Sequence, residues 1–277
     1  MIQEINAEFD NTFQAEEPRN DDSVLCYQGA QILARQTVDA LQYPMAADFS
    51  SESLTRLFSV GGQAYFLART APEHPPLGFD WLPIRALRAA HPQTLAFAGI
   101  TGRHLDYWYR TSRFCGRCGA ENRPSKTERA MVCSKCGLTV YPVIAPAVII
   151  GVCAGDRIVV SRYANRPYQG MALIAGYCEI VETPEDTVRR EVMEEIGLRV
   201  RNIRYYKSQP WGFDHNLLLG FFCEAEPDAV IRPDHRELAE ARWIRREEIG
   251  DLPDSASLTF DMLAAVRYKK DKGGASA

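Results

Sequence analysis

The sequence predicts an α+β protein in which two folded domains flank a short cysteine-rich segment. Three observations lead to this fold class. The chain has 277 residues, which suits about two domains, since a domain usually holds ~100–200 residues. Its second half combines strand-like apolar runs with one strongly marked helix. Four cysteines gather between residues 115 and 136, where the two halves meet.

The composition is that of an ordinary globular protein, with 46% hydrophobic and 25% charged residues, and it excludes a largely disordered chain. The net charge of −4 provides no long-range positive field for nucleic acid, although a local basic patch is compatible with it. The longest apolar stretch, residues 143–154, contains Pro146 and is shorter than the ~20 residues that span a bilayer. No signal peptide is visible, so we expect a cytoplasmic protein with no membrane partner.

Hydrophobic periodicity gives the order of the elements. We expect helices over residues 94–113, 183–196 and 258–268, and strands over residues 148–153, 157–162, 203–207 and 217–224, the first two forming a hairpin. The resulting domains are an N-terminal α+β domain (1–110), the cysteine segment (111–142), a second α+β domain (143–270) and a disordered tail (271–277).

The cysteine segment has the spacing of a structural metal site. The pattern Cys115-x2-Cys118-x14-Cys133-x2-Cys136 contains two CxxC turns, each followed by glycine, which lets the backbone turn tightly around the sulfurs. Four thiolates complete a tetrahedral Zn²⁺ site and leave no open position, so this metal would be structural. The alternative is two redox-active or disulfide-bonded pairs. The scattered cysteines are expected to be small buried hydrophobes: Cys26, Cys153, Cys178 and Cys223.

The helix over residues 183–196 carries the most informative pattern. Thr183 is a good N-cap, Pro184 suits the first turn, and Gly197 is the expected C-terminal stop. Three glutamates at positions i, i+3 and i+4 share one face of this helix: Glu191, Glu194 and Glu195.

Like charges on one helix face repel each other unless a positive group lies among them. Carboxylate oxygens are natural ligands of Mg²⁺ or Mn²⁺, which bridge proteins and substrate phosphates. Arg190 cannot lose its proton and is placed to clamp Glu182. The alternative is a solvated acidic helix face.

The full spacing from Gly176 to Leu198, Gly-x5-Glu-x7-Arg-Glu-Val-x-Glu-Glu-x-Gly-Leu, resembles the Nudix box at every defined position. Nudix enzymes hydrolyse a nucleoside diphosphate linked to another moiety, with divalent metal held by this loop and helix. The resemblance implies a Nudix α/β/α sandwich with a mixed β-sheet, preceded here by a zinc ribbon and an N-terminal domain.

Further motifs resemble the bacterial NADH pyrophosphatase branch of this family, which is usually homodimeric. Residues 124–128 (Pro-Ser-Lys-Thr-Glu) and Tyr141-Pro142 match its ribbon, and residues 208–211 (Ser-Gln-Pro-Trp) match the start of its SQPWPFPxS signature. The rest of that signature departs, because both later prolines and the final serine are replaced while Phe213 remains. Trp211 and Phe213 are expected to stack on a base; the alternative is that both are core aromatics.

The resemblance implies the following roles. Glu191, Glu195, Glu237 and the backbone carbonyl of Ala175 would hold two or three Mg²⁺ or Mn²⁺ ions, and one Zn²⁺ would be bound per chain. Glu194 would complete the metal shell or accept the proton of the attacking water, with Glu182 and Arg190 as supports. The expected substrate contacts are Glu128, Tyr141, Gln209, Pro210, Trp211, Phe213, Asn216 and Glu237.

The expected activity is hydrolysis of the pyrophosphate bond of NADH or NAD⁺ to reduced or oxidised NMN and AMP, in a homodimer, together with removal of the NAD cap from RNA. One alternative is a broader Nudix hydrolase that acts on ADP-ribose or dinucleoside polyphosphates. A non-enzymatic alternative is an RNA-binding zinc-ribbon protein.

Overall fold

The computed structural model describes residues 1–37, 40–164, 170–252 and 256–269. The predicted tail, residues 271–277, lies outside these ranges. The chain divides into two compact units. Of the described residues, the C-terminal unit holds 1, 145–164, 170–210, 216–252 and 256–269, and the N-terminal unit holds 2–37, 40–144 and 211–215. None of the helices in the described ranges is long and apolar enough to cross a membrane.

A six-stranded mixed sheet forms the centre of the C-terminal unit, with the strand order β15-β16-β12-β13-β17 and β14 paired to β12. The strands are β12 (Ala145–Ala154), β13 (Arg157–Tyr163), β14 (Ile174–Tyr177), β15 (Arg201–Trp211), β16 (Asn216–Glu224) and β17 (Leu238–Arg245). Strand β12 runs parallel to β16 and antiparallel to β13 and β14. The predicted mixed sheet is therefore confirmed.

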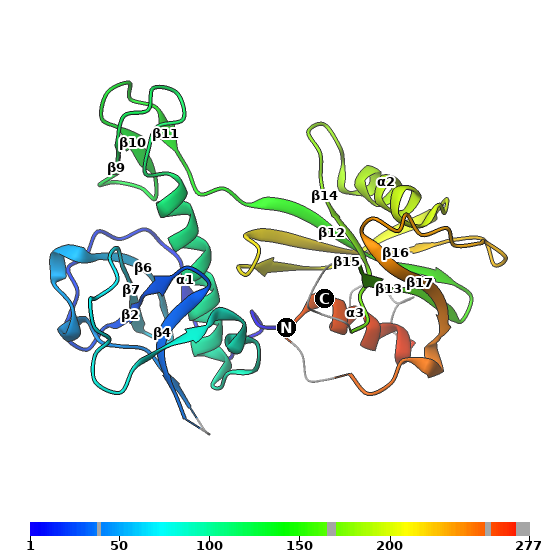
Figure 1. Cartoon of the computed structure of the whole chain (residues 1–277), viewed down its shortest axis with the longest axis horizontal. Helices are drawn as coiled ribbons and strands as arrows, with labels where there is room; N and C mark the ends of the chain where they lie inside the picture. Colours follow the sequence, from blue (N-terminus) through cyan, green and yellow to red (C-terminus); the bar gives the residue numbers. More distant parts are fainter. Residues whose placement is uncertain (38–39, 165–169, 253–255, 270–277) are drawn as a thin grey trace. The chain divides into compact units, whose positions relative to one another are not determined.

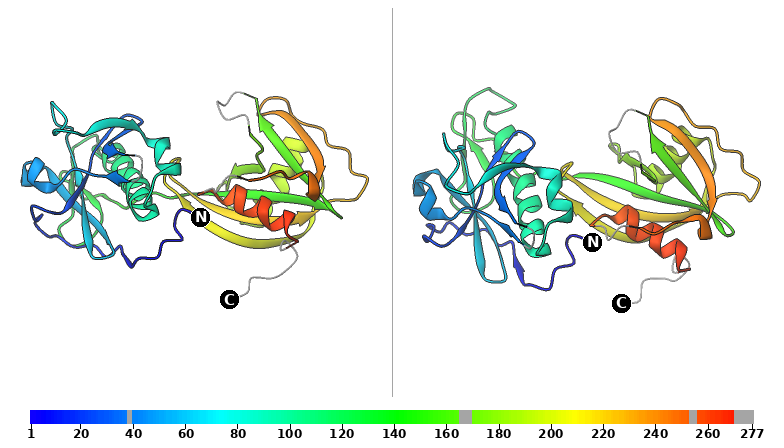
Figure 2. Two further views of the ribbon diagram at one scale, coloured as in Figure 1. Left: turned by 90° about the horizontal axis from the view of Figure 1, so that it is seen from below. Right: turned by 60° about the horizontal axis from the view of Figure 1, so that its bottom comes forward.

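Two helices, α2 (Pro184–Ile196) and α3 (Leu258–Arg267), cover opposite faces of this sheet (Figures 1 and 2). Successive side chains of a strand point to opposite faces. Val148 and Ile150 of β12 share a buried core with Val188 and Val192 of α2. Gly151 points the other way, where an added Cβ would lie 3.6 Å from Met262 of α3. Strand β12 thus lies in the middle layer of an α/β/α sandwich, with α2 on one face of the sheet and α3 on the other.

In the C-terminal unit the predicted elements are found, and two strands of its sheet were missed. The hairpin is formed by β12 and β13, with Cys153 opposite Ile158, and the two later strands are the longer β15 and β16. Strands β14 and β17 were not predicted. Strand β14 has four residues, one of them glycine, and the apolar residues of β17 are interrupted by Glu240, Arg242 and Arg245, so neither gives a clear apolar run.

Before the cysteine segment, the described residues of the N-terminal unit form two small sheets and one long helix (Figure 2). Its strands are β1 (Phe9–Asp10), β2 (Ser23–Leu25), β3 (Tyr27–Gln28), β4 (Gln31–Gln36), β5 (Leu41–Gln42), β6 (Leu54–Val60), β7 (Gln63–Ala68) and β8 (Asp80–Pro83). Helix α1 (Gln93–Thr111) fulfils the prediction for residues 94–113. Short 3-10 helices cover Ala46–Asp48, Ser51–Ser53 and Ile84–Ala89, and in the C-terminal unit Arg246–Glu248.

The cysteine segment folds directly after α1 as a three-stranded ribbon of β9 (Asn122–Pro124), β10 (Met131–Cys133) and β11 (Thr139–Val140). Of the four scattered cysteines, Cys26 and Cys223 are fully buried, as expected. Cys153 and Cys178 are only half-buried, which corrects the expectation for them. Cys153 lies beside the turn of the hairpin and Cys178 lies just past the end of β14, where packing is incomplete.

Candidate functional site

The four clustered cysteines bring their sulfur atoms together. Within the described ranges they are the one group of three or more His, Cys, Asp or Glu whose ligand atoms lie within 4.8 Å of one another. The Sγ atoms of Cys115 and Cys136 are 3.7 Å apart, and those of Cys118 and Cys133 are 3.5 Å apart. A tetrahedron with Zn–S bonds of about 2.3 Å has sulfur–sulfur edges of about 3.8 Å, so the cage has the size for Zn²⁺.

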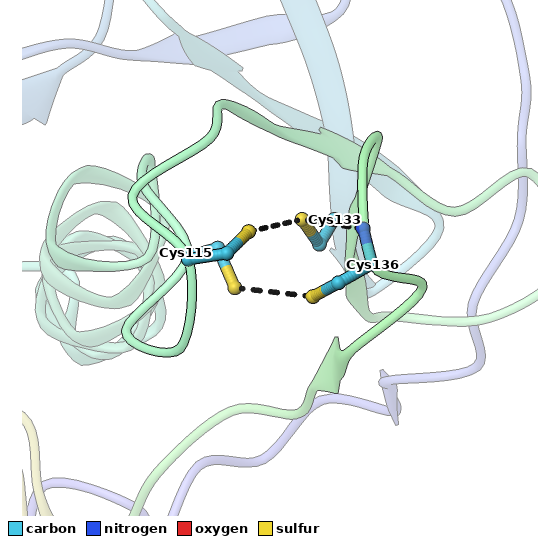
Figure 3. Close-up of side chains that lie close together, drawn as sticks. Cys115, Cys133 and Cys136 are labelled. Atoms are coloured by element: carbon cyan, nitrogen blue, oxygen red, sulfur yellow. Dashed lines mark hydrogen bonds between the residues drawn. The ribbon is translucent and has the colours of Figure 1, made fainter.

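Both CxxC turns follow the same local design, and the cysteine side chains of the two turns face each other (Figure 3). Gly119 and Gly137 have φ values of 72° and 71°, a left-handed conformation that glycine adopts at no steric cost. Backbone N–H groups of Arg117 and Lys135 point at the sulfurs of Cys115 and Cys133. The N–H groups of Cys136 and Lys135 lower the pKa of Cys133 to about 6, which favours the thiolate. All four cysteines are free, which does not fit the alternative of two disulfide-bonded CxxC pairs.

In the C-terminal unit, the carboxylate helix α2 has the predicted ends. The Thr183 side chain accepts the N–H of Asp186 and donates its own hydroxyl to the Asp186 carboxylate, and Pro184 opens the first turn. Gly197 ends the helix at φ 68°, and its N–H donates to the Met193 carbonyl. These ends define the extent of α2, and Val188, Val192 and Ile196 form its face toward the sheet.

One guanidinium, that of Arg190, binds three carboxylates of the predicted set. Its Nε and Nη2 lie 2.6 and 2.9 Å from the two oxygens of Glu182. Its Nη1 lies 2.7 Å from Glu191 and 3.1 Å from Glu194. Nη2 also donates to the backbone carbonyl of Tyr177, at 2.9 Å. Arg190 therefore connects the helix to the end of β14 and to the loop between them.

Glu182 acts as the anchor of that loop. Besides Arg190, its carboxylate accepts the Thr187 hydroxyl at 3.0 Å and the Glu179 N–H at 3.1 Å. The bonds from Arg190, and then the Glu179 N–H, lower the pKa of Glu182 to about 2. A carboxylate with all its oxygens engaged in this way supports the loop and has little capacity left for an ion.

Glu195 is the opposite case. Its side chain is 3% exposed, and neither carboxylate oxygen has a hydrogen-bond partner among the described residues. Burial, followed by the charges of Glu191, Glu237 and Asp234, raises its pKa to about 8, and the nearby N–H of Ala175 counters this only weakly. Buried carboxylates are normally paired. Two unpaired oxygens among other carboxylates are what a bound cation would complete.

Glu191 and Glu195 of α2 form, beside strand β14, a cluster of buried carboxylates that we call the acidic centre. Burial raises the pKa of Glu191 despite its bond to Arg190. An added Cβ on Gly176 of β14 would lie 2.0 Å from the Glu191 carboxylate, so only glycine lets that carboxylate approach the strand. The N–H of Ala175 faces Glu195. Because the N–H and C=O of a strand residue point to the same edge, its carbonyl lies on that side as well.

Glu237 and Glu194 lie at the periphery of this centre. Glu237 is exposed, directly before β17, and its charge raises the pKa of both Glu191 and Glu195. The Glu194 side chain is 59% exposed and is held by Arg190. Among the described residues, the oxygens of three such carboxylates do not lie within 4.8 Å of one another, as the four sulfurs do. The donor set of hard oxygens nevertheless fits a divalent cation such as Mg²⁺ or Mn²⁺.

The expected substrate contacts fall in three places. In the ribbon, the Tyr141 hydroxyl donates to Glu128 at 3.2 Å, and the charge of Glu128 raises the pKa of Tyr141. Both side chains are exposed. In the C-terminal unit, Asn216 is 6% exposed, and its Nδ2 lies 3.5 Å from the Tyr177 hydroxyl. Pro210 is exposed at the end of β15.

Gln209 and Trp211 are placed differently from the expectation. Gln209 is fully buried; its Nε2 donates to the Ala256 carbonyl and its Oε1 accepts the N–H of Leu258, at the start of α3. Trp211 is 9% exposed, packs with Phe213 at 4.7 Å and donates to Asp214. These contacts agree with the alternative of core aromatics for Trp211, whereas Phe213 is half-buried.

Sequence reasoning missed two residues of this region, Tyr177 and Thr187. Both occupy undefined positions of the box, so its spacing gave no signal for them. Thr187 is fully buried and holds Glu182. Tyr177 has an exposed ring, at 52%, while its backbone carbonyl is fixed by Arg190. The one indication in the sequence was an aromatic residue directly after Gly176.

Comparisons with known proteins agree with the geometry. The family model described as the NUDIX domain matches residues 143–265, and the model described as the NADH pyrophosphatase zinc ribbon domain matches residues 110–141. A protein of Salmonella heidelberg named NAD-capped RNA hydrolase NudC is 41% identical over 61% of this chain and 67% of its own length. The protein of that name from Salmonella schwarzengrund is 42% identical over the same shares.

Among solved structures, a NUDIX hydrolase from Nitrosomonas europaea matches 59% of this chain and 95% of its own, with a TM-score of 0.50 and 24% identity. This likeness shows the fold. A mixed sheet with a carboxylate-bearing helix, joined to a four-cysteine ribbon, defines the class of metal-dependent hydrolases with a zinc-binding module. The chain belongs to the Nudix hydrolase family, in the branch that carries the NADH pyrophosphatase zinc ribbon.

Proposed function

We propose that this protein hydrolyses the pyrophosphate bond of NADH and NAD⁺, giving reduced or oxidised NMN and AMP, and that it removes the NAD cap from RNA. The observation that carries the proposal is Glu195, a buried carboxylate with two unpaired oxygens in a family whose enzymes use divalent cations. The Salmonella relatives named NAD-capped RNA hydrolase support the choice of substrate.

Glu191, Glu195, Glu237 and the Ala175 carbonyl are the proposed ligands, and Mg²⁺ or Mn²⁺ is the proposed ion because all four offer hard oxygen atoms. A divalent cation supplies two things at such a site: it neutralises pyrophosphate oxygens, and it lowers the pKa of a bound water.

The protein's own residues have separate tasks in this mechanism. Arg190 keeps Glu191 and Glu194 in place through the same guanidinium that holds Glu182. Of Glu191, Glu194 and Glu195, Glu194 is the most exposed, which suits it either to accept a proton from the attacking water or to complete the ligand set. Glu182 stays ionised and bonded, so its task is to keep the loop fixed.

For the nucleotide, the ribbon contributes Glu128 and Tyr141, whose side chains bond to each other and are exposed. Tyr177 offers an exposed ring fixed at its backbone, which suits stacking against a base. Phe213, Asn216 and Pro210 are proposed as further contacts. We propose Gln209 as a support of α3, because its amide is fully engaged there. We further propose that the protein is cytoplasmic and forms a homodimer. Size-exclusion chromatography tests the oligomeric state.

The direct test is product analysis. The protein is incubated with Mn²⁺ or Mg²⁺ and with NADH, NAD⁺, ADP-ribose or NAD-capped RNA, and initial rates and products are measured. We expect NMN (or its reduced form) and AMP from the dinucleotides, 5′-monophosphate RNA from the capped RNA, and loss of all of these in Glu195→Gln. A clear preference for ADP-ribose would favour the broader hydrolase. Binding of uncapped RNA that is unchanged in Glu195→Gln, without hydrolysis, would favour the RNA-binding alternative.

A further inference from the structure

Residues 225–237, which connect β16 to β17, run along the C-terminal end of α2. The N–H of Arg232 donates to the carbonyl of Ile196 at 2.9 Å, and the N–H of Asp234 donates to the carbonyl of Glu195 at 3.0 Å. The last carbonyls of a helix have no partner within the helix. The connecting segment supplies these partners, so its backbone is tied to the residue whose carboxylate lies at the acidic centre.

The Asp234 side chain then organises the chain that follows it. Its Oδ1 accepts three backbone N–H groups, those of Arg236 at 3.1 Å, Glu237 at 3.2 Å and Leu238 at 3.4 Å. His235, which lies between Asp234 and the first of these donors, has a φ of 59°, a left-handed conformation that is uncommon for a residue with a Cβ. Leu238 is fully buried in the core shared with α2. The turn from Asp234 to Leu238 is therefore fixed at both ends.

Glu237 lies inside this turn. Its own N–H is one of the three donors to Asp234, and its carboxylate is close enough to raise the pKa of Glu191 and Glu195. Partial burial opposes ionisation of Asp234, but the N–H groups of Glu237, Leu238 and Arg236 outweigh it and lower the pKa of Asp234. Asp234 is thus an ionised acceptor that joins the end of α2 to the backbone of Glu237.

We propose that Asp234 is a positioning residue for the metal centre: it acts through Glu237, by holding the backbone of the turn that presents this carboxylate opposite Glu195. The residues that orient metal ligands contribute about 10–100-fold to metal affinity in proteins. Asp234 has no part in the box spacing, so this assignment comes from the hydrogen bonds alone.

The structure also offers a second way in which Asp234 could act, because its charge is one of those that raise the pKa of Glu195. The two ways are separable by substitution. In Asp234→Asn the side-chain oxygen can still accept the three N–H groups, but the charge is gone. In Asp234→Ala both the acceptor and the charge are gone. If the turn geometry is what matters, asparagine should largely replace aspartate.

The experiment is a double-mutant cycle read out by Mn²⁺ affinity without substrate, using calorimetry or the electron paramagnetic resonance signal of free Mn²⁺. We expect Asp234→Ala to weaken Mn²⁺ binding by about tenfold or more and Asp234→Asn to stay within about threefold of the wild type. Combined with Glu237→Gln, Asp234→Ala should add no further loss, because its effect passes through Glu237. Asp228→Ala, an exposed aspartate of the same connection, is the matched control and should bind as the wild type does.

Three results would overturn the assignment: wild-type affinity in Asp234→Ala, equal losses in the alanine and asparagine variants, or additive losses in the cycle. The thermal midpoint and zinc content of each variant show whether it is folded. If the alanine variant is not folded, a loss of Mn²⁺ affinity greater than about threefold in Asp234→Asn would overturn the assignment. This role presupposes the proposed hydrolase function, yet the two can fail separately. A wild type that binds Mn²⁺ but cleaves neither NADH nor NAD⁺ would refute the function and leave the cycle interpretable.

Discussion

The zinc ribbon and the acidic centre on α2 are both built to hold metal, and they do so in opposite ways. In the ribbon, four sulfurs already lie within 4.8 Å of one another, and backbone N–H groups support them. At α2 the carboxylates are more widely spaced, and Glu195 has no partner for its buried oxygens among the described residues. The ribbon supplies all four ligands of its metal from protein side chains, whereas the ligand set of the acidic centre leaves room for substrate.

The same contrast appears in the backbone. Where the ribbon needs a positive φ it uses Gly119 and Gly137, but the loop before α2 places Val181 at a φ of 78°. Strained conformations of residues with a Cβ tend to gather at functional sites. A structural metal site minimises strain, and a functional one tolerates it.

The largest expected effect is the loss of zinc. Because structural Zn²⁺ contributes about 10–16 kcal/mol to the folding of small zinc modules, Cys133→Ser should unfold the ribbon and reduce zinc from one ion per chain to none. Zinc content and limited proteolysis of residues 110–141 measure this. Mn²⁺ binding at α2 should persist, since its ligands lie in the other unit. A ribbon that stays folded without zinc would contradict the claim that this metal site is structural.

The next largest effect is expected for Glu195→Gln. The ligand is lost, so kcat/KM should fall by at least about 100-fold, beyond the usual effect of residues that only orient ligands. At pH 8 in EDTA the thermal midpoint should instead rise, because an unpaired buried charge is replaced by a neutral amide of similar size. Steady-state kinetics and thermal melts check both. A variant less stable than the wild type in EDTA would show that the carboxylate is satisfied without metal.

The pH dependence follows from the same residue. Burial raises the pKa of Glu195 from 4.5 to about 8, so the folded state holds this proton more tightly than the unfolded chain does. In the metal-free protein the resulting stabilisation is complete below pH 4.5 and is lost as the pH rises to about 8. A metal ion must displace the proton, so Mn²⁺ affinity should increase by up to about tenfold per pH unit over that window. Calorimetry from pH 5 to 9 measures it, and a flat profile would contradict the role of Glu195.

The smallest effect is expected for Val181→Gly. The Val181 side chain is 97% exposed, so no packing is lost. Relief of the left-handed strain, about 1–3 kcal/mol, should exceed the entropy cost of glycine and leave a net stabilisation of about 1 kcal/mol. The control is Ile180→Gly, also exposed but without a positive φ, which should be slightly destabilising because glycine loses more entropy on folding. Urea unfolding compares the two variants. Equal effects would show that the loop is not strained.

The sequence alone was sufficient wherever one local pattern determined the structure. The spacing of Cys115 and Cys136 predicted the cage, and Thr183 and Gly197 predicted the ends of α2. The clamp of Glu182 by Arg190 was also foreseen from residue types. These features depend on short stretches of chain whose geometry is nearly fixed by capping and turn preferences.

What the sequence could not provide depends on distant contacts. The bonds of Gln209 to Leu258 and of the Asp234 N–H to the Glu195 carbonyl join residues that lie far apart in the sequence. The N-terminal sheets were not predicted either, because strands such as β1 and β5 have only two residues. Tertiary pairing, which periodicity does not report, decides such elements.

The most direct test of the central claim is anomalous X-ray scattering from crystals grown with Mn²⁺, which locates the ions independently of any activity. We predict Mn²⁺ bound by Glu191, Glu195 and Glu237 beside the Ala175 carbonyl, and zinc alone in the ribbon. Glutamates that point into solvent with no ion between them, in crystals saturated with Mn²⁺, would contradict the account.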